Sequence, residues 1–133
     1  PEYRLDERYM AAAEKDAKAQ GRSVTFTTNI QEAYTGAEFV YAKSWGALPY
    51  FGNWDAEKPM REANRHFMVD MEKMALTPNA RFSHCLPVRR NVKVTDAVLD
   101  SPRAIHIDEA ENRLHVQKAL LAHLVGQVPR KGG

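Results

Sequence analysis

The chain has 133 residues and a mass of 15.1 kDa, the size of one domain. Its hydrophobic share of 44% and charged share of 27% are typical of a soluble globular protein and exclude disorder and a coiled coil. A net charge of +2, no apolar run near the ~20 residues of a membrane span and a single cysteine, Cys85, predict a cytoplasmic protein with no disulfide and no nucleic-acid or membrane partner.

The first half of the chain alternates helical and strand-like patterns. In chain order the patterns predict a helix over 6–20, a strand over 23–27, a short helix over 29–34, a strand over 39–42 and a long loop over 43–59. Gly21 and Gly36 stand where the two helices end, and Asn29 stands where a side chain caps the second helix. The loop is predicted from its Gly, Pro, Trp and Asn content.

The second half continues the alternation. It predicts a helix over 69–76, a strand over 81–83, a short helix over 95–99, a strand over 104–107 and a final helix. Asp108 and Glu111 have the spacing of a capping box, which places the start of the final helix at Asp108. Two apolar stripes on this helix predict burial over much of its circumference.

Strands that alternate with helices predict an α/β fold with a mostly parallel sheet flanked by helices. About four strands is few for such a sheet, so we expect missing sheet partners. Ligands of parallel sheets bind at the carboxyl ends of the strands. Three segments leave those ends, namely the loop from Lys43 to Gly46, the run from His84 to Pro87, and the turn that leads to Arg113.

General motif searches exclude several kinds of site. The sequence has no glycine-rich phosphate loop and no nucleophile elbow. Its five histidines lie at no spacing that suits a metal, so we expect neither a metal nor a cofactor. The basic residues that follow His84, as far as Lys93, suit a small anionic substrate.

Two motifs carry a resemblance to a known family. His84-Cys85-Leu86-Pro87 is similar to the H-C-L-P signature of the ornithine carbamoyltransferases, and the run from Glu109 to Ala119 resembles their A-E-N-R-L-H segment. The order and spacing of the two motifs agree with the family, whereas aspartate carbamoyltransferases differ at the first one. The resemblance implies the Rossmann-like second domain of a transcarbamylase, truncated at its N-terminus.

The resemblance also implies a division of the chain. Residues 1–108 would form the incomplete amino-acid-binding domain, and residues 109–126 a helix that packs back on the first domain, followed by a tail over 127–133. The two phosphate- and carbamoyl-binding motifs of the first domain do not occur in the sequence. We therefore expect this chain to expose apolar surface and to be inactive by itself.

Two departures from the ornithine enzymes resemble the branch that uses N-acetylornithine. Lys43, followed by Ser44-Trp45-Gly46, replaces an aspartate that suits a free ammonium group. A lysine repels an ammonium group and attracts a carboxylate, as an N-acylated ornithine requires. Lys93 replaces a glutamate, and in this branch the matching lysine is carboxylated. Arg89 and Arg90 are close in sequence and favour the neutral amine that takes up carbon dioxide.

The resemblance assigns a role to each candidate residue. The catalytic candidates are Cys85 and Arg113. Cys85 and Leu86 would contact carbamoyl phosphate through backbone carbonyls, and Arg113 would bind its oxygens. Lys43 and Leu86 would contact the acetylornithine. The alternatives are a buried apolar thiol at Cys85, a surface ion pair between Arg113 and Glu109, and solvated lysines at 43 and 93.

The implied reaction transfers the carbamoyl group of carbamoyl phosphate to the side-chain amine of N-acetyl-L-ornithine. The product is N-acetyl-L-citrulline, used for arginine synthesis, and the family forms homotrimers. Two alternatives remain within the enzymes, with N-succinylornithine or free ornithine as the substrate. A third alternative is a non-catalytic module that binds a metabolite on the same α/β scaffold.

Overall fold

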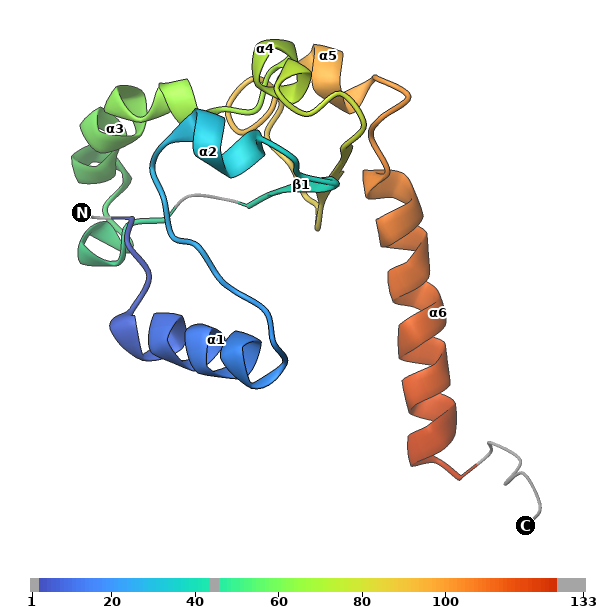
Figure 1. Ribbon diagram of the computed structural model, residues 1–133. Helices are drawn as coiled ribbons and strands as arrows, with labels where there is room; N and C mark the ends of the chain where they lie inside the picture. The colour runs from blue at the N-terminus through green and yellow to red at the C-terminus, as the bar shows by residue number, and fades with distance from the viewer. Residues whose placement is uncertain (1–2, 44–45, 127–133) are drawn as a thin grey trace.

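The computed structural model describes residues 3–43 and 46–126 (Figure 1). Its elements are α1 (Glu7–Ala19), α2 (Ile30–Tyr34), β1 (Phe39–Ala42), η1 (Leu48–Tyr50), α3 (Trp54–Ala63), η2 (Arg65–Phe67), α4 (Met71–Ala75), β2 (Arg81–His84), α5 (Asp96–Leu99) and α6 (His106–Leu124). The two η elements are single 3₁₀ turns. This order alternates helix and strand, which confirms the α/β class.

The predicted helices with local end signals are confirmed. The Asp6 carboxylate caps α1 by accepting from the Arg8 N–H, and α1 is followed by Gly21 at φ +67°. The Asn29 side chain accepts from the Glu32 N–H at 3.2 Å and starts α2. Such caps satisfy helix-end groups with neighbouring residues alone, so a sequence reveals them well.

The sheet is a parallel pair, β1 and β2. Their register pairs Phe39 with Arg81 and continues to Ala42 with His84. On the side away from β1, β2 forms one isolated parallel bridge, between Phe82 and Ala104. The crossover from β1 to β2 runs through η1, α3, η2 and α4, and this brings the carboxyl ends of both strands to the same edge.

Two predicted strands are wrong. Residues 23–27 have an extended pattern but no regular structure, and they form the connection between α1 and α2 (Figure 1). Residues 104–107 give only the bridge at Ala104, because α6 already begins at His106. A strand needs a neighbour for its backbone groups, and residues 23–27 have none among the described residues.

The predicted loop over 43–59 is also wrong in its second half. The Asn53 side chain accepts from the Ala56 N–H at 3.1 Å and starts α3 at Trp54. Pro59 lies inside this helix, although the sequence analysis placed it in the loop. A proline removes one helical hydrogen bond, and here the Asn53 cap and the acidic first turn outweigh that loss.

The core lies between the strand pair and the short helices α4 and α5. Its fully buried side chains are Phe82, Met74, Val94 and Val98, joined by His84. Phe82 is on the inner face of β2, while Met74 and Val98 come from α4 and α5. This small cluster positions β2, and therefore positions the residues that follow it.

The last helix, α6, differs from its prediction in two ways. It begins at His106 after Ile105, which makes no side-chain cap, so the capping box at Asp108 is wrong. None of its described residues is buried, and the helix projects away from the rest of the molecule (Figure 1). Its predicted burial is therefore absent in this chain, because only its first turns reach the strands. Within residues 3–43 and 46–126, no helix has the length and apolar character of a membrane span.

Candidate active site

The carboxyl ends of β1 and β2 bring three predicted site residues together. Ala42 pairs with His84 at the last register position, so the next residues, Lys43 and Cys85, are neighbours. The Lys43 Nζ lies 3.2 Å from the Cys85 Sγ. From α6, the Arg113 guanidinium donates to the Cys85 carbonyl at 2.6 Å. The three segments predicted to leave the strand ends therefore meet at one point.

The turn after Cys85 has an unusual backbone. Leu86 has a φ of +47°, in the left-handed region that a leucine rarely adopts, and the Leu86–Pro87 peptide is cis. The Leu86 N–H donates to the His84 Nδ1 at 3.0 Å. The chain thus reverses just after β2, and the surrounding structure holds Leu86 in a costly conformation of the kind that clusters at functional sites.

The hydrogen bond at His84 fixes the form of its ring. Because the Nδ1 accepts from a backbone N–H, the ring proton resides on Nε2. Burial lowers the pKa of His84, which keeps the ring neutral. The Nε2 atom is buried and finds no partner among the described residues. His84 therefore supports the turn from inside the core and leaves one buried donor beside the strand ends.

Sequence reasoning missed the role of Glu109. Its carboxylate accepts from the Tyr41 hydroxyl at 2.9 Å and from the Ser83 hydroxyl, so it ties α6 to both strands. Tyr41 and Ser83 are register partners in the sheet. The hydrogen bond to Glu109 raises the pKa of Tyr41 to about 12. The sequence places Glu109 at the start of the second motif segment, but its spacing of four residues from Arg113 suggested only a surface ion pair.

The electrostatics of the strand ends favour a thiolate. Hydrogen bonds from Lys43 and Tyr41 lower the pKa of the Cys85 thiol below its ordinary value of 9.0. A low pKa makes a cysteine more nucleophilic toward added reagents. The thiol, the Lys43 ammonium and the Arg113 guanidinium form a polar group that can bind an anion and orient a carbonyl.

Lys93 lies in the same cavity as Lys43. This cavity, of about 550 Å³, is also lined by Tyr34, Tyr41 and Val69. Lys93 is buried, with only 6% of its surface exposed. Burial and the charges of Arg61 and Arg89 lower its pKa to about 8, against an opposing effect of Glu57. The predicted Ser44-Trp45 part of the adjoining loop lies outside the described residues.

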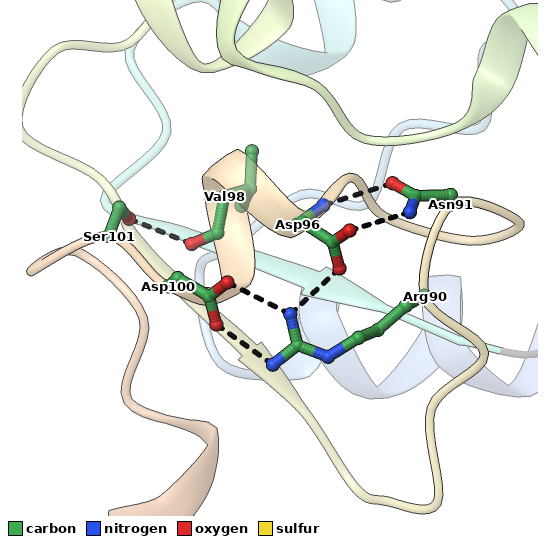
Figure 2. A network of polar contacts seen from close by, with 6 residues as sticks. All are labelled: Arg90, Asn91, Asp96, Val98, Asp100 and Ser101. Atoms are coloured by element: carbon green, nitrogen blue, oxygen red, sulfur yellow. Dashed lines mark hydrogen bonds and ion pairs between the residues drawn. The ribbon is translucent and has the colours of Figure 1, made fainter.

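A surface network holds the segment between Leu86 and Lys93. Figure 2 shows the Arg90 guanidinium donating to both Asp100 oxygens, at 2.8 and 3.0 Å, and to Asp96 at 2.8 Å. Asn91 and Asp96 exchange two hydrogen bonds, at 2.7 and 3.1 Å. Asn91 has a φ of +56°, which an asparagine tolerates. The network therefore anchors this segment on α5.

The described part of the chain holds no group of three His, Cys, Asp or Glu side chains that could bind a metal ion.

Comparisons with known proteins agree with this geometry. Residues 1–124 match the family model for the Asp/Orn binding domain of aspartate/ornithine carbamoyltransferases. The chain is 64% identical over 127 residues to an N-acetylornithine carbamoyltransferase of Xanthomonas campestris, which covers 96% of this chain and 38% of that protein. It is 39% identical over 112 residues to an ornithine carbamoyltransferase of Rhodopseudomonas palustris, covering 84% of this chain and 35% of that one.

A solved structure shows the same fold. The crystal structure of an acetylornithine transcarbamylase complexed with acetylcitrulline has a TM-score of 0.84 and 63% identity, over 93% of this chain and 37% of that one. The chain thus spans less than two fifths of the length of these relatives. The family model covers nearly the whole chain, and the structural likeness covers 93% of it. On this evidence the chain belongs to the aspartate/ornithine carbamoyltransferase family.

Proposed function

We propose that this chain supplies the amino-acid-binding part of an enzyme that carbamoylates N-acetyl-L-ornithine. The reaction moves the carbamoyl group of carbamoyl phosphate to the side-chain amine and gives N-acetyl-L-citrulline and phosphate. The observation that carries the proposal is the meeting of Lys43, the Cys85 carbonyl and Arg113 at the strand ends. Related structures are complexed with carbamyl phosphate and with acetylcitrulline, which supports this substrate class.

The site residues divide between the two substrates. Arg113 would place its positive charge on the oxygens of carbamoyl phosphate, where negative charge develops as the amine attacks the carbonyl carbon. The carbonyls of Cys85 and Leu86 would accept from the carbamoyl amide and orient it. The C–O bond to phosphate breaks as the new C–N bond is completed, and the proton that the amine loses passes to the departing phosphate. No step requires the Cys85 thiol as a nucleophile, so the rate enhancement comes from holding the two substrates in position.

Lys43 decides the choice of amino acid. Its ammonium group lies at the end of β1, beside Cys85, where it would pair with the carboxylate of the substrate. Free ornithine brings an α-ammonium group to the same place and would be repelled. Acetylation removes that charge and leaves the carboxylate, so the charge of Lys43 supports an N-acylated substrate.

We also propose that Lys93 carries a carboxyl group. Its neutral amine would add carbon dioxide to give an N-carboxylate and release one proton. The charges of Arg61 and Arg89 near Lys93 favour this product. Carboxylation replaces a buried positive charge beside these two cations with a negative one.

The modification is tested by labelling with ¹³C-bicarbonate. A carbamate resonance should grow as the pH rises through about 8, since the neutral amine is the reactive form. The Lys93→Arg variant should lack the resonance, while Lys73→Arg, a control on α4, should keep it. Retention of the resonance in Lys93→Arg would exclude this site.

The assembly is part of the proposal. We expect α6 to pack against the domain that the relatives carry outside the matched region, and we expect a homotrimer. The exposed apolar residues along α6 support this placement. They include Leu114, Leu121 and Leu124, which are more than half exposed in this chain.

A chimera tests the function. The matched segment of the Xanthomonas campestris relative is replaced by this chain, and carbamoyl transfer is measured with N-acetylornithine, N-succinylornithine and ornithine. Preference for N-acetylornithine supports the proposal, and Lys43→Asp should weaken that preference. Preference for ornithine would show that Lys43 does not contact the substrate. Binding of carbamoyl phosphate without turnover of any substrate would favour the non-catalytic module.

A further inference from the structure

Two side chains on the first turns of α6 reach the strands. Arg113 donates to the Cys85 carbonyl at 2.6 Å. Glu109, one helical turn earlier, accepts from the hydroxyls of Tyr41, at 2.9 Å, and Ser83. Residues four apart lie on the same face of a helix. The carboxylate and the guanidinium therefore face the same sheet, but the function proposed above gives a task only to Arg113.

The helix has few other attachments to the sheet. None of its described residues is buried, and it projects away from the strands (Figure 1). In the part of the chain that the structure describes, three side-chain hydrogen bonds join α6 to β1, β2 and the residue after β2. Glu109 makes two of them and Arg113 makes the third.

The backbone holds the helix only at its start. Just before α6, the Ile105 N–H donates to the Phe82 carbonyl at 2.8 Å. This bond fixes the point from which the helix leaves the sheet. A rod that is held at one point can still pivot, so a second attachment is needed to fix the direction of the helix axis.

Glu109 is better suited than Arg113 to supply this second attachment. Under the proposed function, the Arg113 guanidinium and the Cys85 carbonyl both contact carbamoyl phosphate, so the bond between them competes with the substrate. The partners of Glu109 have no part in those contacts. Tyr41 and Ser83 are register partners within the sheet, and they precede the edge at which the substrates would bind. The hydrogen bonds of Glu109 can therefore persist while the site is occupied.

The electrostatics of Glu109 suit an attachment of this kind. The hydrogen bonds from Ser83 and Tyr41 lower the pKa of Glu109 below its ordinary value of 4.5, and the charge of Arg113 acts in the same direction. The carboxylate is therefore ionised at neutral pH. Ser83 is buried, with 6% of its surface exposed, so one of the two bonds is shielded from water. Hydrogen bonds to a charged acceptor are stronger than bonds between neutral groups.

We propose that Glu109 is a positioning residue, whose carboxylate fastens α6 to Tyr41 and Ser83 and thereby places Arg113 to meet the oxygens of carbamoyl phosphate. The link is continuous, because a single helical turn, about 6 Å along the axis, separates Glu109 from Arg113. The part that concerns carbamoyl phosphate rests on the proposed function. The attachment of the helix does not. Glu109 itself touches neither substrate.

A double-mutant cycle in the chimera tests whether Glu109 acts through the two hydroxyls. Glu109→Ala removes the acceptor, and Tyr41→Phe combined with Ser83→Ala removes both donors. Glu109→Gln keeps the length and an acceptor oxygen, so it should retain most of the attachment. The matched control is Glu111→Ala on the same helix, where the side chain is 70% exposed. Should Glu109→Ala fail to fold, Glu109→Gln and the variant that lacks both hydroxyls carry the same comparison.

The attachment is measured without reference to activity. Hydrogen exchange is followed by mass spectrometry of peptides that cover the first turns of α6. We expect exchange several-fold faster than in the parent for Glu109→Ala, and near the parent rate for Glu111→Ala. Adding the changes at Tyr41 and Ser83 to Glu109→Ala should bring no further acceleration. Unchanged exchange in Glu109→Ala, or effects that simply add across the cycle, would overturn the attachment.

The consequence for the substrate is measured by kinetics on the same proteins. In Glu109→Ala the KM for carbamoyl phosphate should rise about tenfold. The KM for N-acetylornithine, measured at saturating carbamoyl phosphate, should stay near its starting value, because Lys43 follows β1 and is not carried by α6. Glu109→Gln should recover most of the KM for carbamoyl phosphate.

The two KM values separate positioning from a general loss of structure. Equal rises in both, or an unchanged KM for carbamoyl phosphate in Glu109→Ala, would contradict a role through Arg113. An unmodified chimera without activity would overturn the proposed function, and the exchange data would still decide the attachment of the helix.

Discussion

At the scale of single residues, the site depends on charges that lie next to one another through sheet pairing. Lys43 and Cys85 are far apart in the chain and 3.2 Å apart in space. The lowered pKa of Cys85 records this proximity, since Lys43 is its main cause. Electrostatic pairing of this kind is a property of the fold that a single substitution can remove.

Lys43→Met should make Cys85 less reactive. Without the ammonium group, the pKa of the thiol rises toward its ordinary value of 9.0, and the thiolate fraction at pH 7 falls. We expect alkylation of Cys85 by iodoacetamide to slow several-fold. The folded protein is alkylated, and the extent is then read by mass spectrometry of the peptide that contains Cys85. Lys58→Met, on the exposed side of α3, is the control. An unchanged rate in Lys43→Met would show that the contact does not persist in solution.

The candidate site could be predicted from sequence where the motif itself makes the contacts. Cys85 and Arg113 belong to the two segments that carried the resemblance, and the structure joins them directly. Glu109 lies in the second segment too, but its partners Tyr41 and Ser83 become visible only when the strand register is known. The buried bond between Glu57 and the Ala47 amide could not be predicted either, because it joins residues ten positions apart that carry no motif.

At the scale of elements, local signals predicted the capped helices and the two strands that pair, β1 and β2, but missed α3. The Asp6 and Asn29 caps predict α1 and α2 because each cap involves neighbouring residues. Residues 23–27 carry an alternating pattern but have no neighbouring strand among the described residues, so this predicted strand is wrong. The end of the loop at Trp54 was missed because Pro59 counted against a helix that the Asn53 cap nevertheless starts.

The buried strand β2 should be the most sensitive element. Phe82 is 0% exposed and lies at the centre of the core cluster. Phe82→Ala should lower the free energy of unfolding by about 3–5 kcal/mol through lost burial and a cavity. Urea denaturation of the chimera measures this. Phe51→Ala, at a residue 92% exposed, should change it by less than about 0.5 kcal/mol. Equal effects of the two variants would contradict the placement of the core.

The network on α5 should stabilise the site segment in a pH-dependent way. Arg90 lowers the pKa of Asp96 and Asp100 below 3.8, so its contribution is present above that value and is lost as the pH falls through the lowered values. Arg90→Ala should therefore be less stable than the parent at pH 7, and the difference should shrink as the pH falls below 3.8. Both groups are exposed, so salt should also weaken the effect. Arg65→Ala is the control, and a difference that does not shrink below pH 3.8 would contradict this account.

At the scale of the whole molecule, α6 is the feature that needs a covering surface. It projects from the strands (Figure 1). Leu114 and Leu121, both exposed, lie on one of its two apolar stripes. Contiguous apolar surface of this kind marks interaction sites. The final helix was predicted to be buried over much of its circumference, and none of its described residues is buried.

The isolated chain should associate through this stripe. Replacing Leu114 and Leu121 with glutamine should abolish concentration-dependent association, measured by sedimentation velocity over a tenfold concentration range. Lys118→Gln, on the same helix, should leave it unchanged. Association that persists in the double variant would show that a different surface of the chain mediates it.

The parallel pairing of β1 with β2 also has a consequence for how the site comes into being. Each β1 residue pairs with one 42 positions later, as do Lys43 and Cys85. Closing so long a segment is entropically costly and slows folding. Helices with local caps can form early in the folding reaction, but the edge that joins Lys43 and Cys85 arises only when this closure is complete. Binding of a ligand at this edge should therefore detect only molecules that have completed the last cooperative step of folding. Partly folded states that precede this step should not bind.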